Sequence, residues 1–335
     1  MFEPLSGEAL RHAVHNRPPA RIALTEELLY ERTATMIAAD PGAGKSTVIT
    51  QIMLQLTAAQ PVFGFFYTPQ PRNVYYLQLE GDPDETLERI DFMGRTLTID
   101  YERFRLDCPI FLDCLDELSI LETIQRINTW DKVPDVIVID PIYMAVSGDL
   151  KDGQVSSALV HFSERLKRTF RCAVVLVHHT HRERYGNSGE RISENDPYYG
   201  SQWLKAHIDV GYHLRALDGH TGVELICKKS RGGEVQKHIS LAYDPATFTV
   251  RTDVEQSSMS GEARVIHHLR RCAGQNIQTD FYATLAETHL SQASLRRIQR
   301  RLEDNGTIQI VAGEGRRRLW RLTESMASQS QSAVS

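Results

Sequence analysis

The residues with the clearest chemical role form a glycine-rich segment that runs from Ala39 to Ser46. Gly42 and Gly44 keep this turn clear of side chains, so backbone N–H groups can face phosphate oxygens beside the following helix. Lys45 would reach the β- and γ-phosphates, and the Ser46 hydroxyl would bind Mg²⁺. An apolar run precedes the segment and an amphipathic stretch follows it. The spacing therefore predicts a site for the phosphates of ATP.

This segment fits the Walker A pattern with alanine in place of its first glycine, a substitution that the wider form of the pattern admits. The predicted ATP-binding residues are Ala39, Asp40, Pro41, Gly42, Ala43, Gly44, Lys45, Ser46 and Thr47. The predicted cofactors are ATP and Mg²⁺, since a Walker A serine binds the metal together with the phosphates.

Two carboxylates follow apolar runs and suit phosphate chemistry. Asp140 ends the run Val136–Ile139, and Glu80 ends the run Val74–Leu79. Asp140 is predicted to hold the magnesium shell together with Ser46. Glu80 is predicted to orient or deprotonate the water that attacks the γ-phosphate. The alternative for Glu80 is a solvated strand end.

Two further carboxylates, Asp82 and Asp84, lie close to Glu80 and compete with it for the catalytic role. Asp82 precedes Pro83, which indicates an N-cap followed by proline at the first helical position. We therefore assign Asp82 and Asp84 to helix capping.

A parallel sheet flanked by helices must position these side chains, because short apolar runs alternate with amphipathic stretches from Thr33 to about Phe170. The predicted strands are Thr33–Ala39, Val74–Leu79, Phe104–Leu112, Val136–Ile139 and Ala173–Val177. The predicted helices are Lys45–Ala59, Asp84–Met93, Glu117–Trp130 and Gln154–Phe170. A long polar loop, His178–Tyr199, follows. Four alternating runs then predict antiparallel strands that extend the sheet: Ile208–Leu217, Val223–Lys229, Gln236–Tyr243 and Phe248–Arg251.

The composition is that of an ordinary globular protein, with 41% hydrophobic and 24% charged residues. No apolar stretch of about 18 residues is present, so we expect a cytoplasmic protein without membrane contact. Five cysteines without a C-x-x-C pair indicate neither a disulfide framework nor a zinc knuckle, and we expect them to be small buried hydrophobes. The net charge of −5 excludes a uniformly basic coat for nucleic acid.

In several motifs, in the right order, the chain resembles the RecA-like P-loop ATPases, in particular the RepA-type hexameric replicative helicases of plasmids and, more distantly, DnaB-type helicases. The resemblance spans about Leu28 to Arg251. It rests on Ala39–Ser46, Tyr76-Leu-Gln-Leu-Glu80, Val138-Ile-Asp-Pro141, Leu176-Val-His-His179-Thr, Gly200-Ser201 and Lys228-Lys-Ser-Arg231-Gly. It implies a RecA-like core, a catalytic glutamate at Glu80 and a homo-oligomer, expected to be a hexamer.

The resemblance also implies roles for a histidine and two cations. His179 matches the residue that senses the γ-phosphate, with His178 as the close alternative. A metal site on the histidine cluster that includes His181 is not expected, because neighbouring residues of a strand end cannot all face one point. Lys229 and Arg231 match the cations that one subunit supplies to the nucleotide of its neighbour, and a solvated basic hairpin is the alternative. Lys205 and Arg215 are lesser candidates.

Nucleic acid would pass through the centre of such a ring, held by loops near the nucleotide. The segments 147–154 and 181–199 qualify. The second of them offers Arg182, Arg184, Tyr185, Arg191 and Tyr199, although acidic residues in the same loop oppose this role.

The last quarter of the chain predicts three helices followed by a β-hairpin, the arrangement of a winged helix-turn-helix. The helices are Gly261–Cys272, Asp280–Thr288 and Ser291–Asn305, and the strands are Thr307–Val311 and Arg318–Leu322. Outward-facing arginines of the third helix and the wing are predicted to contact DNA: Arg296, Arg297, Arg300, Arg301, Arg316, Arg317, Arg318 and Arg321. A protein-docking module is the alternative.

The sequence therefore predicts an α/β protein with a RecA-like motor at 1–255, a winged helix at 256–325 and a disordered tail at 326–335. The predicted function is an ATP-hydrolysing DNA helicase or translocase on single-stranded DNA, in replication of a phage, plasmid or mobile element. A replication initiator, a primase or another replisome protein is the expected partner. The alternatives are an ATP-switched regulatory protein of the KaiC kind without unwinding activity, and a small-molecule kinase.

Overall fold

A computed structural model describes most of the chain. The described residues are 6–15, 22–40, 42–179, 184–185, 191–192, 202–217, 222–231, 238–252, 265–266, 268–269, 272, 278–288, 292–304, 306–313 and 318–323. The predicted tail at 326–335 lies outside them, as do residues 255–261 at the predicted boundary between the two domains.

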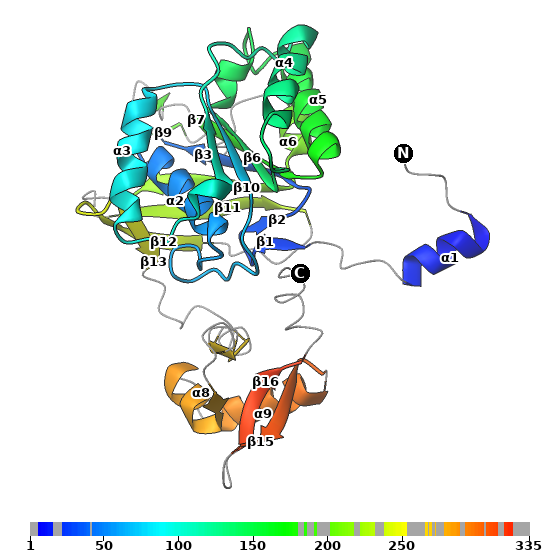
Figure 1. The fold of residues 1–335 in the computed structure, drawn as a ribbon, viewed down its shortest axis with the longest axis vertical. Coiled ribbons are helices and arrows are strands. Elements are labelled where there is room, and N and C mark those ends of the chain that lie inside the picture. The colour runs from blue at the N-terminus through cyan, green and yellow to red at the C-terminus, as the bar shows by residue number, and fades with distance from the viewer. Residues whose placement is uncertain are drawn as a thin grey trace.

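Among the described residues, a nine-stranded sheet organises the chain up to Thr252, as Figure 1 shows. Its strand order is β13-β12-β11-β10-β3-β7-β6-β4-β5. The strands are β3 (Ala34–Ala39), β4 (Val74–Gln78), β5 (Phe104–Asp107), β6 (Val136–Asp140), β7 (Ala173–His179), β10 (Val210–Ala216), β11 (Gly222–Ser230), β12 (His238–Asp244) and β13 (Thr249–Thr252). The six strands from β10 to β5 pair in parallel, whereas β11, β12 and β13 pair antiparallel.

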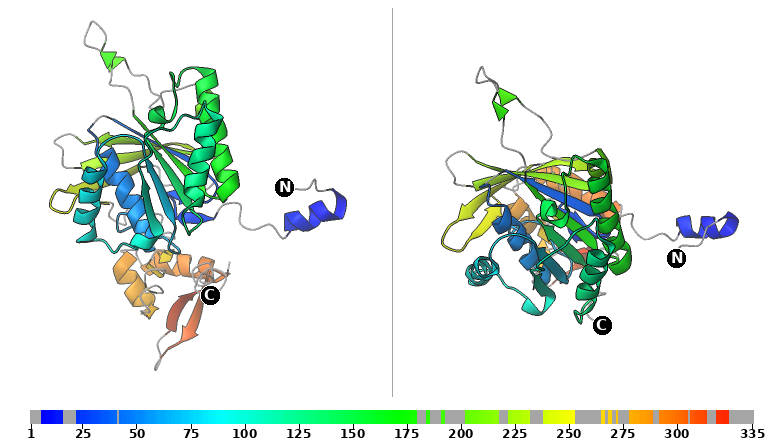
Figure 2. Two further views of the ribbon diagram at one scale, coloured as in Figure 1. Left: turned by 45° about the horizontal axis from the view of Figure 1, so that its top comes forward. Right: turned by 90° about the horizontal axis from the view of Figure 1, so that it is seen from above.

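Helices cover both faces of this sheet. They are α2 (Lys45–Thr57), α3 (Pro83–Gly94), α4 (Glu117–Asn128), α5 (Gly153–Phe170) and α6 (Gln202–His207), with short 3-10 turns η1 (Tyr101–Arg103) and η2 (Ile142–Ala145). One buried cluster joins α2 to alternate residues of the parallel strands, and a second joins α4 and α5 to the residues between them. The turned views in Figure 2 show α2 and α5 on opposite sides of the sheet. The α/β architecture that the sequence predicts is thereby confirmed.

Three of the parallel strands, β3, β4 and β6, are buried along their whole length, which explains their continuous apolar runs. In β6, for example, all residues from Val136 to Asp140 are buried. These strands are apolar on both faces because helices cover both faces of the sheet. Asp140 is a polar exception, and a buried carboxylate needs hydrogen-bond partners.

Two predictions about strands were wrong. The predicted strand Phe104–Leu112 ends as β5 at Asp107, because Pro109 follows almost at once and cannot donate to a ladder. The run Ile208–Leu217 pairs antiparallel with β11 as predicted, but it pairs in parallel with β3. The chain therefore changes from parallel to antiparallel pairing only after β10.

Several short elements carry too little periodicity to be predicted. They are α1 (Gly7–His15), the hairpin of β1 (Ala23–Thr25) and β2 (Leu29–Tyr30), the pair of β8 (Arg184–Tyr185) and β9 (Arg191–Ile192), and α6. The β1–β2 hairpin packs Leu24, Leu28 and Leu29 into the core on the α2 face of the sheet. None of the described helices combines the length and the apolar character that crossing a membrane requires.

The C-terminal part has its own apolar cluster, which includes Val265, Leu295, Leu302 and Trp320. Its described elements are β14 (Thr279–Asp280), α8 (Phe281–Thr288), α9 (Gln292–Asp304), β15 (Ile308–Ala312) and β16 (Arg318–Leu322). The strands form a small antiparallel sheet in the order β14-β16-β15. Helical residues at 265–266, 268–269 and 272 precede them.

Candidate active site

The glycine-rich segment joins β3 to α2 and leaves the start of α2 open. Gly44 is the N-cap of α2 with a φ of 71°, and Gly42 has a φ of 77°, so both need the left-handed freedom of glycine. No side chain caps the first turn of α2, and that turn has no acidic residue. Uncapped N–H groups at a helix N-terminus attract anions. The segment thus has the geometry of a phosphate cradle, although Pro41 lies outside the described residues.

Lys45 and Asp140 form an ion pair at this edge of the sheet, with 2.7 Å between Lys45 Nζ and Asp140 Oδ1. Both side chains are largely buried, with exposed fractions of 12% and 8%. The second carboxylate oxygen, Oδ2, accepts a hydrogen bond of 2.6 Å from the Tyr76 hydroxyl. The predicted lysine and aspartate therefore lie together, and they have a third partner that the sequence interpretation missed.

The residues predicted to hold magnesium fit that ion chemically. The Asp140 carboxylate and the Ser46 hydroxyl supply oxygen ligands, which Mg²⁺ prefers. Mg²⁺ usually binds only one or two protein carboxylates when phosphates supply its other ligands. Asp140 Oδ1 already faces a cation, the ammonium of Lys45. An oxygen that binds the ammonium of Lys45 can instead bind a metal ion that enters with a nucleotide.

Glu80, His179 and Tyr143 meet beside the ion pair. His179 Nε2 lies 3.8 Å from Glu80 Oε2, and the ring centroids of His179 and Tyr143 are 5.6 Å apart. Burial lowers the pKa of His179, as does the nearby charge of Lys45, and both favour the neutral ring. Burial and a hydrogen bond to Glu80 raise the pKa of Tyr143.

The strand positions separate the competing candidates for these roles. His178 is 3% exposed, whereas the neighbouring His179 reaches Glu80. Asp82 caps α3, since its carboxylate accepts a hydrogen bond from the Asp84 backbone N–H at 2.9 Å. Of these carboxylates, Glu80 is thus the one that lies beside His179. Asp82 caps α3, as predicted.

A second contact missed by the sequence interpretation anchors the start of the phosphate cradle. His213 of β10 lies with Nε2 2.9 Å from Asp40 Oδ1, and the Asp40 backbone N–H donates to the Leu214 carbonyl at 3.1 Å. No local spacing links these residues, because the contact depends on the pairing of β10 with β3. The cradle is therefore held from the strand beside it.

Lys229 and Arg231 lie at the opposite edge of the sheet from the chain's own phosphate cradle. Ser230 pairs with Val210, which pairs with Thr35 near the amino end of β3, whereas the cradle follows its carboxyl end. The strand from Thr35 to its end spans about 13 Å at about 3.3 Å per residue. Neither cation therefore reaches the nucleotide that its own cradle would hold.

The cations at this edge differ in exposure. Lys229 is partly buried and its ammonium donates to the Lys205 carbonyl, and burial lowers its pKa. Arg231 is exposed, and its backbone N–H donates to the Asp209 carbonyl at 2.8 Å. Arg215 pairs with Glu224 on the neighbouring strand.

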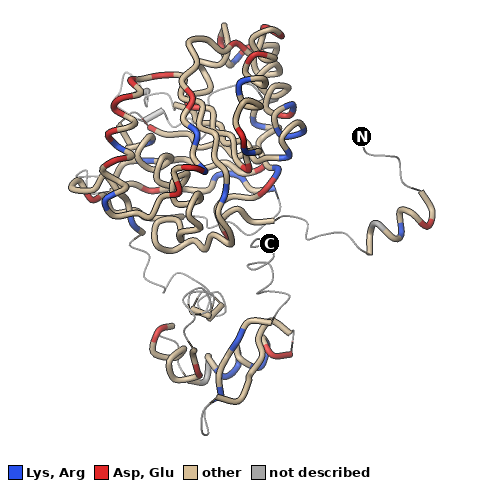
Figure 3. Tube along the Cα trace, in the orientation of Figure 1, with Lys and Arg blue, Asp and Glu red and all other residues tan. Residues whose placement is uncertain are grey.

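The residues predicted to contact DNA fall in two regions. In the 181–199 segment Arg184 and Arg191 lie in the strands β8 and β9, and Arg182 and Tyr199 lie outside the described residues. In the C-terminal part the exposed arginines are Arg296, Arg297, Arg300, Arg301, Arg318 and Arg321, while Arg316 and Arg317 lie outside the described residues. The apolar stripe of Leu295, Ile298 and Leu302 is buried as predicted. Figure 3 shows the acidic and basic residues interspersed over the sheet domain.

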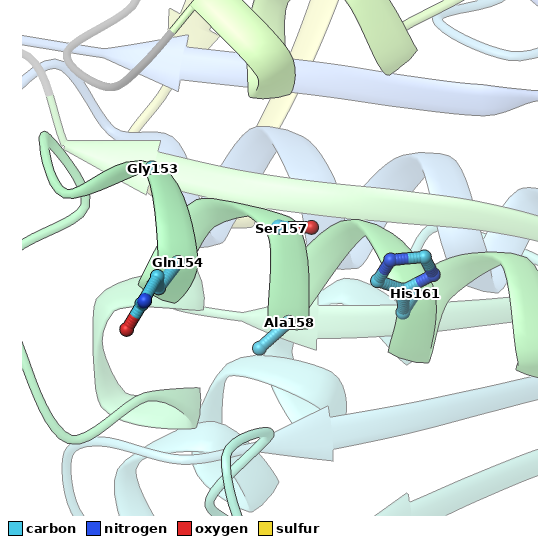
Figure 4. A pocket seen from close by; sticks show the side chains of 5 residues that line it. All are labelled: Gly153, Gln154, Ser157, Ala158 and His161. Carbon is cyan, nitrogen blue, oxygen red and sulfur yellow. The ribbon is translucent and has the colours of Figure 1, made fainter.

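A separate surface hollow of about 460 Å³ lies along the first turns of α5, as Figure 4 shows. Gly153, Gln154, Ser157, Ala158 and His161 line it. None of these is a predicted ATP or magnesium residue, but Gly153 and Gln154 belong to the 147–154 segment predicted to hold nucleic acid. Among the cysteines, Cys114, Cys172 and Cys272 are buried as expected, but Cys108 and Cys227 are partly exposed.

A family model described as an AAA domain matches residues 4–184. This range holds the phosphate cradle, Glu80, Asp140 and His179, and it covers more than half of the chain. The chain belongs to this AAA domain family. The membership and the geometry of the phosphate cradle together make it a P-loop ATPase with an α/β core, the coarser part of the sequence prediction.

Two solved structures resemble this AAA domain protein. One is the RadB recombinase, with 16% identity, a TM-score of 0.44, and coverage of 67% of this chain and 92% of that one. The other is a KaiC-like protein from the hyperthermophilic archaeon Pyrococcus horikoshii OT3, with 11% identity, a TM-score of 0.46, and coverage of 69% and 94%. No curated protein sequence matches the chain.

Proposed function

We propose that this AAA domain protein is an ATP-driven helicase or translocase that assembles as a ring, expected to be a hexamer, around single-stranded DNA. The observation that carries the proposal is the distance between the two halves of the predicted catalytic set. Arg231 lies at the amino edge of the sheet and the phosphate cradle lies beyond its carboxyl edge. If Arg231 serves catalysis, it serves the nucleotide of another subunit, and head-to-tail contacts of that kind form rings when the rotation between subunits closes.

The chain's own residues divide the work of hydrolysis. The N–H groups at the start of α2 and the Lys45 ammonium bind the phosphates, so Lys45 leaves Asp140 Oδ1 when a nucleotide enters. Glu80 accepts the proton of the attacking water, and His179, whose Nε2 lies 3.8 Å from Glu80 Oε2, senses the γ-phosphate. Ser46 and Asp140 would hold a magnesium ion, which would supply positive charge against that of the phosphates.

Arg231 of a neighbouring subunit would stabilise the charge that develops during phosphoryl transfer. Hydrolysis then depends on assembly, because each phosphate cradle is incomplete until a neighbour docks. Lys229 is proposed for the same interface, although in this structure its ammonium is bound to the Lys205 carbonyl.

The C-terminal part is proposed to be a winged helix that binds DNA. Its described order of helix, short strand, two helices and a hairpin supports this, as does the pairing of β14 with β16. Exposed arginines of α9 and β16 supply cations for phosphates. Replication of a phage, plasmid or mobile element, with an initiator, primase or other replisome protein as partner, is the setting that the motif resemblance suggests.

Strand displacement on forked duplex DNA tests the proposal, with the full chain and Lys45→Ala as the matched inactive variant. We expect ATP-dependent unwinding of one fork polarity by the wild type and none by Lys45→Ala. DNA-stimulated ATPase without unwinding on either polarity would overturn the helicase proposal in favour of an ATP-switched regulator. An ATPase rate that single-stranded DNA does not change, measured on a monomeric protein, would instead favour a small-molecule kinase.

A further inference from the structure

The carboxylate of Asp140 has a different partner on each oxygen. Oδ1 faces the Lys45 ammonium at 2.7 Å, and Oδ2 accepts from the Tyr76 hydroxyl at 2.6 Å. Lys45 is the P-loop lysine and is drawn to phosphates when a nucleotide binds. Oδ1 is therefore the oxygen that becomes available to a metal ion, and Oδ2 is the oxygen that stays with the protein.

Tyr76 is built into the protein on every side. It is 3% exposed in the middle of β4, on the face of the sheet that α2 covers. Its hydroxyl also lies beside the Thr50 side chain of α2, which is 1% exposed and acts on the pKa of the phenol. The chain of contacts Thr50–Tyr76–Asp140 thus links α2, which begins at the phosphate cradle, to the end of β6.

The direction of the Tyr76 hydrogen bond follows from its surroundings. The buried phenol is the donor, and the Asp140 carboxylate, which is 6% exposed, is the acceptor. A protonated phenol beside a carboxylate donates to it, and donors to charged acceptors make the stronger hydrogen bonds.

We propose that Tyr76 is a positioning residue, which fixes the Asp140 carboxylate so that Oδ1 faces the magnesium ion of the bound nucleotide. The proposal rests on the assignment of Asp140 to magnesium in the proposed function. The terminal torsion of an aspartate is broad, so a carboxylate without its Oδ2 partner can turn about it. Outer partners of metal ligands typically contribute about 10–100-fold in metal affinity.

The same strand offers a matched control. The neighbouring Tyr75 is 1% exposed, and its hydroxyl donates to the Asp107 carboxylate at 2.6 Å. It lies on the opposite face of the sheet, against Trp130 beyond α4. Tyr75→Phe therefore removes a buried tyrosine–aspartate hydrogen bond of the same length from the same strand, but away from the nucleotide site.

The test is a Mg²⁺ titration of the binding of a fluorescent ATP analogue to the full chain. Wild type, Tyr76→Phe and Tyr75→Phe are compared, with EDTA to define binding without metal. We expect the Mg²⁺ concentration at half-saturation to rise by about tenfold or more in Tyr76→Phe. We expect Tyr75→Phe to stay within about twofold of the wild type, and binding in EDTA to be equal in all three.

An unchanged Mg²⁺ half-saturation in Tyr76→Phe, or an equal rise in both variants, overturns the proposal. Wild-type binding that does not respond to Mg²⁺ overturns instead the assignment of Asp140 to magnesium. If circular dichroism shows that Tyr76→Phe does not fold, Thr50→Val replaces it, because it loosens Tyr76 from α2 without deleting its hydroxyl. The same titration then decides, and an unchanged half-saturation again counts against Tyr76.

Discussion

The two edges of the parallel sheet both bury cations against carboxylates, but they hold the carboxylates differently. At the carboxyl edge the Asp140 oxygens are bound by two side chains, Lys45 and Tyr76. At the amino edge the carboxylates accept from the backbone: Asp135 Oδ2 from the Asn73 N–H at 2.8 Å, and Asp209 Oδ2 from the Ala34 N–H at 2.9 Å.

This difference separates exchangeable contacts from permanent ones. A side-chain cation such as Lys45 can leave its carboxylate when a phosphate offers a better partner. A carboxylate bonded to the backbone N–H of a neighbouring strand cannot change partner without disturbing the sheet. The carboxyl edge is thus suited to binding ligands, and the amino edge is suited to holding the strands in register.

Arg231 is the residue that crosses this division, since it lies at the amino edge and is proposed to act at a carboxyl edge. We expect Arg231→Ala to lower the ATPase rate by about 10³-fold or more, the effect of losing an arginine finger. Equal mixing with Lys45→Ala should restore activity, because about one half times one half, a quarter, of the head-to-tail interfaces would be complete. The measurement is steady-state ATPase of each variant and of the mixture.

The control for that experiment is Lys228→Ala, which removes an exposed lysine from the end of β11, just before Arg231, and should retain activity. The idea of a shared site fails if the two inactive variants co-assemble and the mixture stays inactive. In that case the amino edge would have only its structural role.

Arg72 tests the structural role of the amino edge. It is 3% exposed, and its guanidinium lies 2.8 Å from Glu31 and 3.5 Å from Asp135. Removal of one member of a buried pair costs about 3–5 kcal/mol. Because Glu31 and Asp135 keep contact with water, we expect Arg72→Ala to lower the free energy of unfolding by about 3 kcal/mol, the low end of that range.

Urea unfolding measures this loss, and the ATPase KM should not change. Arg95→Ala is the control, since Arg95 pairs with Asp91 on the exposed side of α3 and should contribute less than about 1 kcal/mol. A large rise in KM without a loss of stability would show that the two edges are not independent.

His207 predicts a smaller, pH-dependent effect near the same edge. Burial lowers the pKa of His207, and the positive charges of Lys167 and Arg231 lower it further. The negative charges of Glu164 and Asp209 oppose this shift. The unfolded chain protonates this histidine near a pKa of about 6.5, whereas the folded protein keeps it neutral to lower pH. Falling pH below about 6.5 therefore favours the unfolded state through this group.

We expect the wild type to lose stability between pH 7 and pH 5 more steeply than His207→Asn. Urea unfolding at several pH values measures the two slopes. His161→Asn, at an exposed histidine of α5, is the control and should keep the wild-type slope. Equal slopes in all three proteins would contradict the assigned burial of His207.

Most of the sheet and the long helices could be predicted from the sequence, because their patterns are local. The bounds of α2, α3, α4 and α5 lie within about two residues of the predicted ones. The short α1, the β1–β2 hairpin and α6 could not be predicted. Elements of two to nine residues contain too few turns or alternations for a period to appear, and tertiary contacts decide whether they form.

The sequence by itself determined the chemistry of the phosphate cradle, since the spacing of Gly42, Gly44 and Lys45 specifies both the turn and the charge. Only the tertiary structure decided what surrounds it. Tyr76 and His213 enter the site through strand pairing, and the distance of Arg231 from its own cradle follows from the antiparallel turn after β10. Motifs record neighbours along the chain, whereas these contacts join residues that only the order of strands in the sheet brings together.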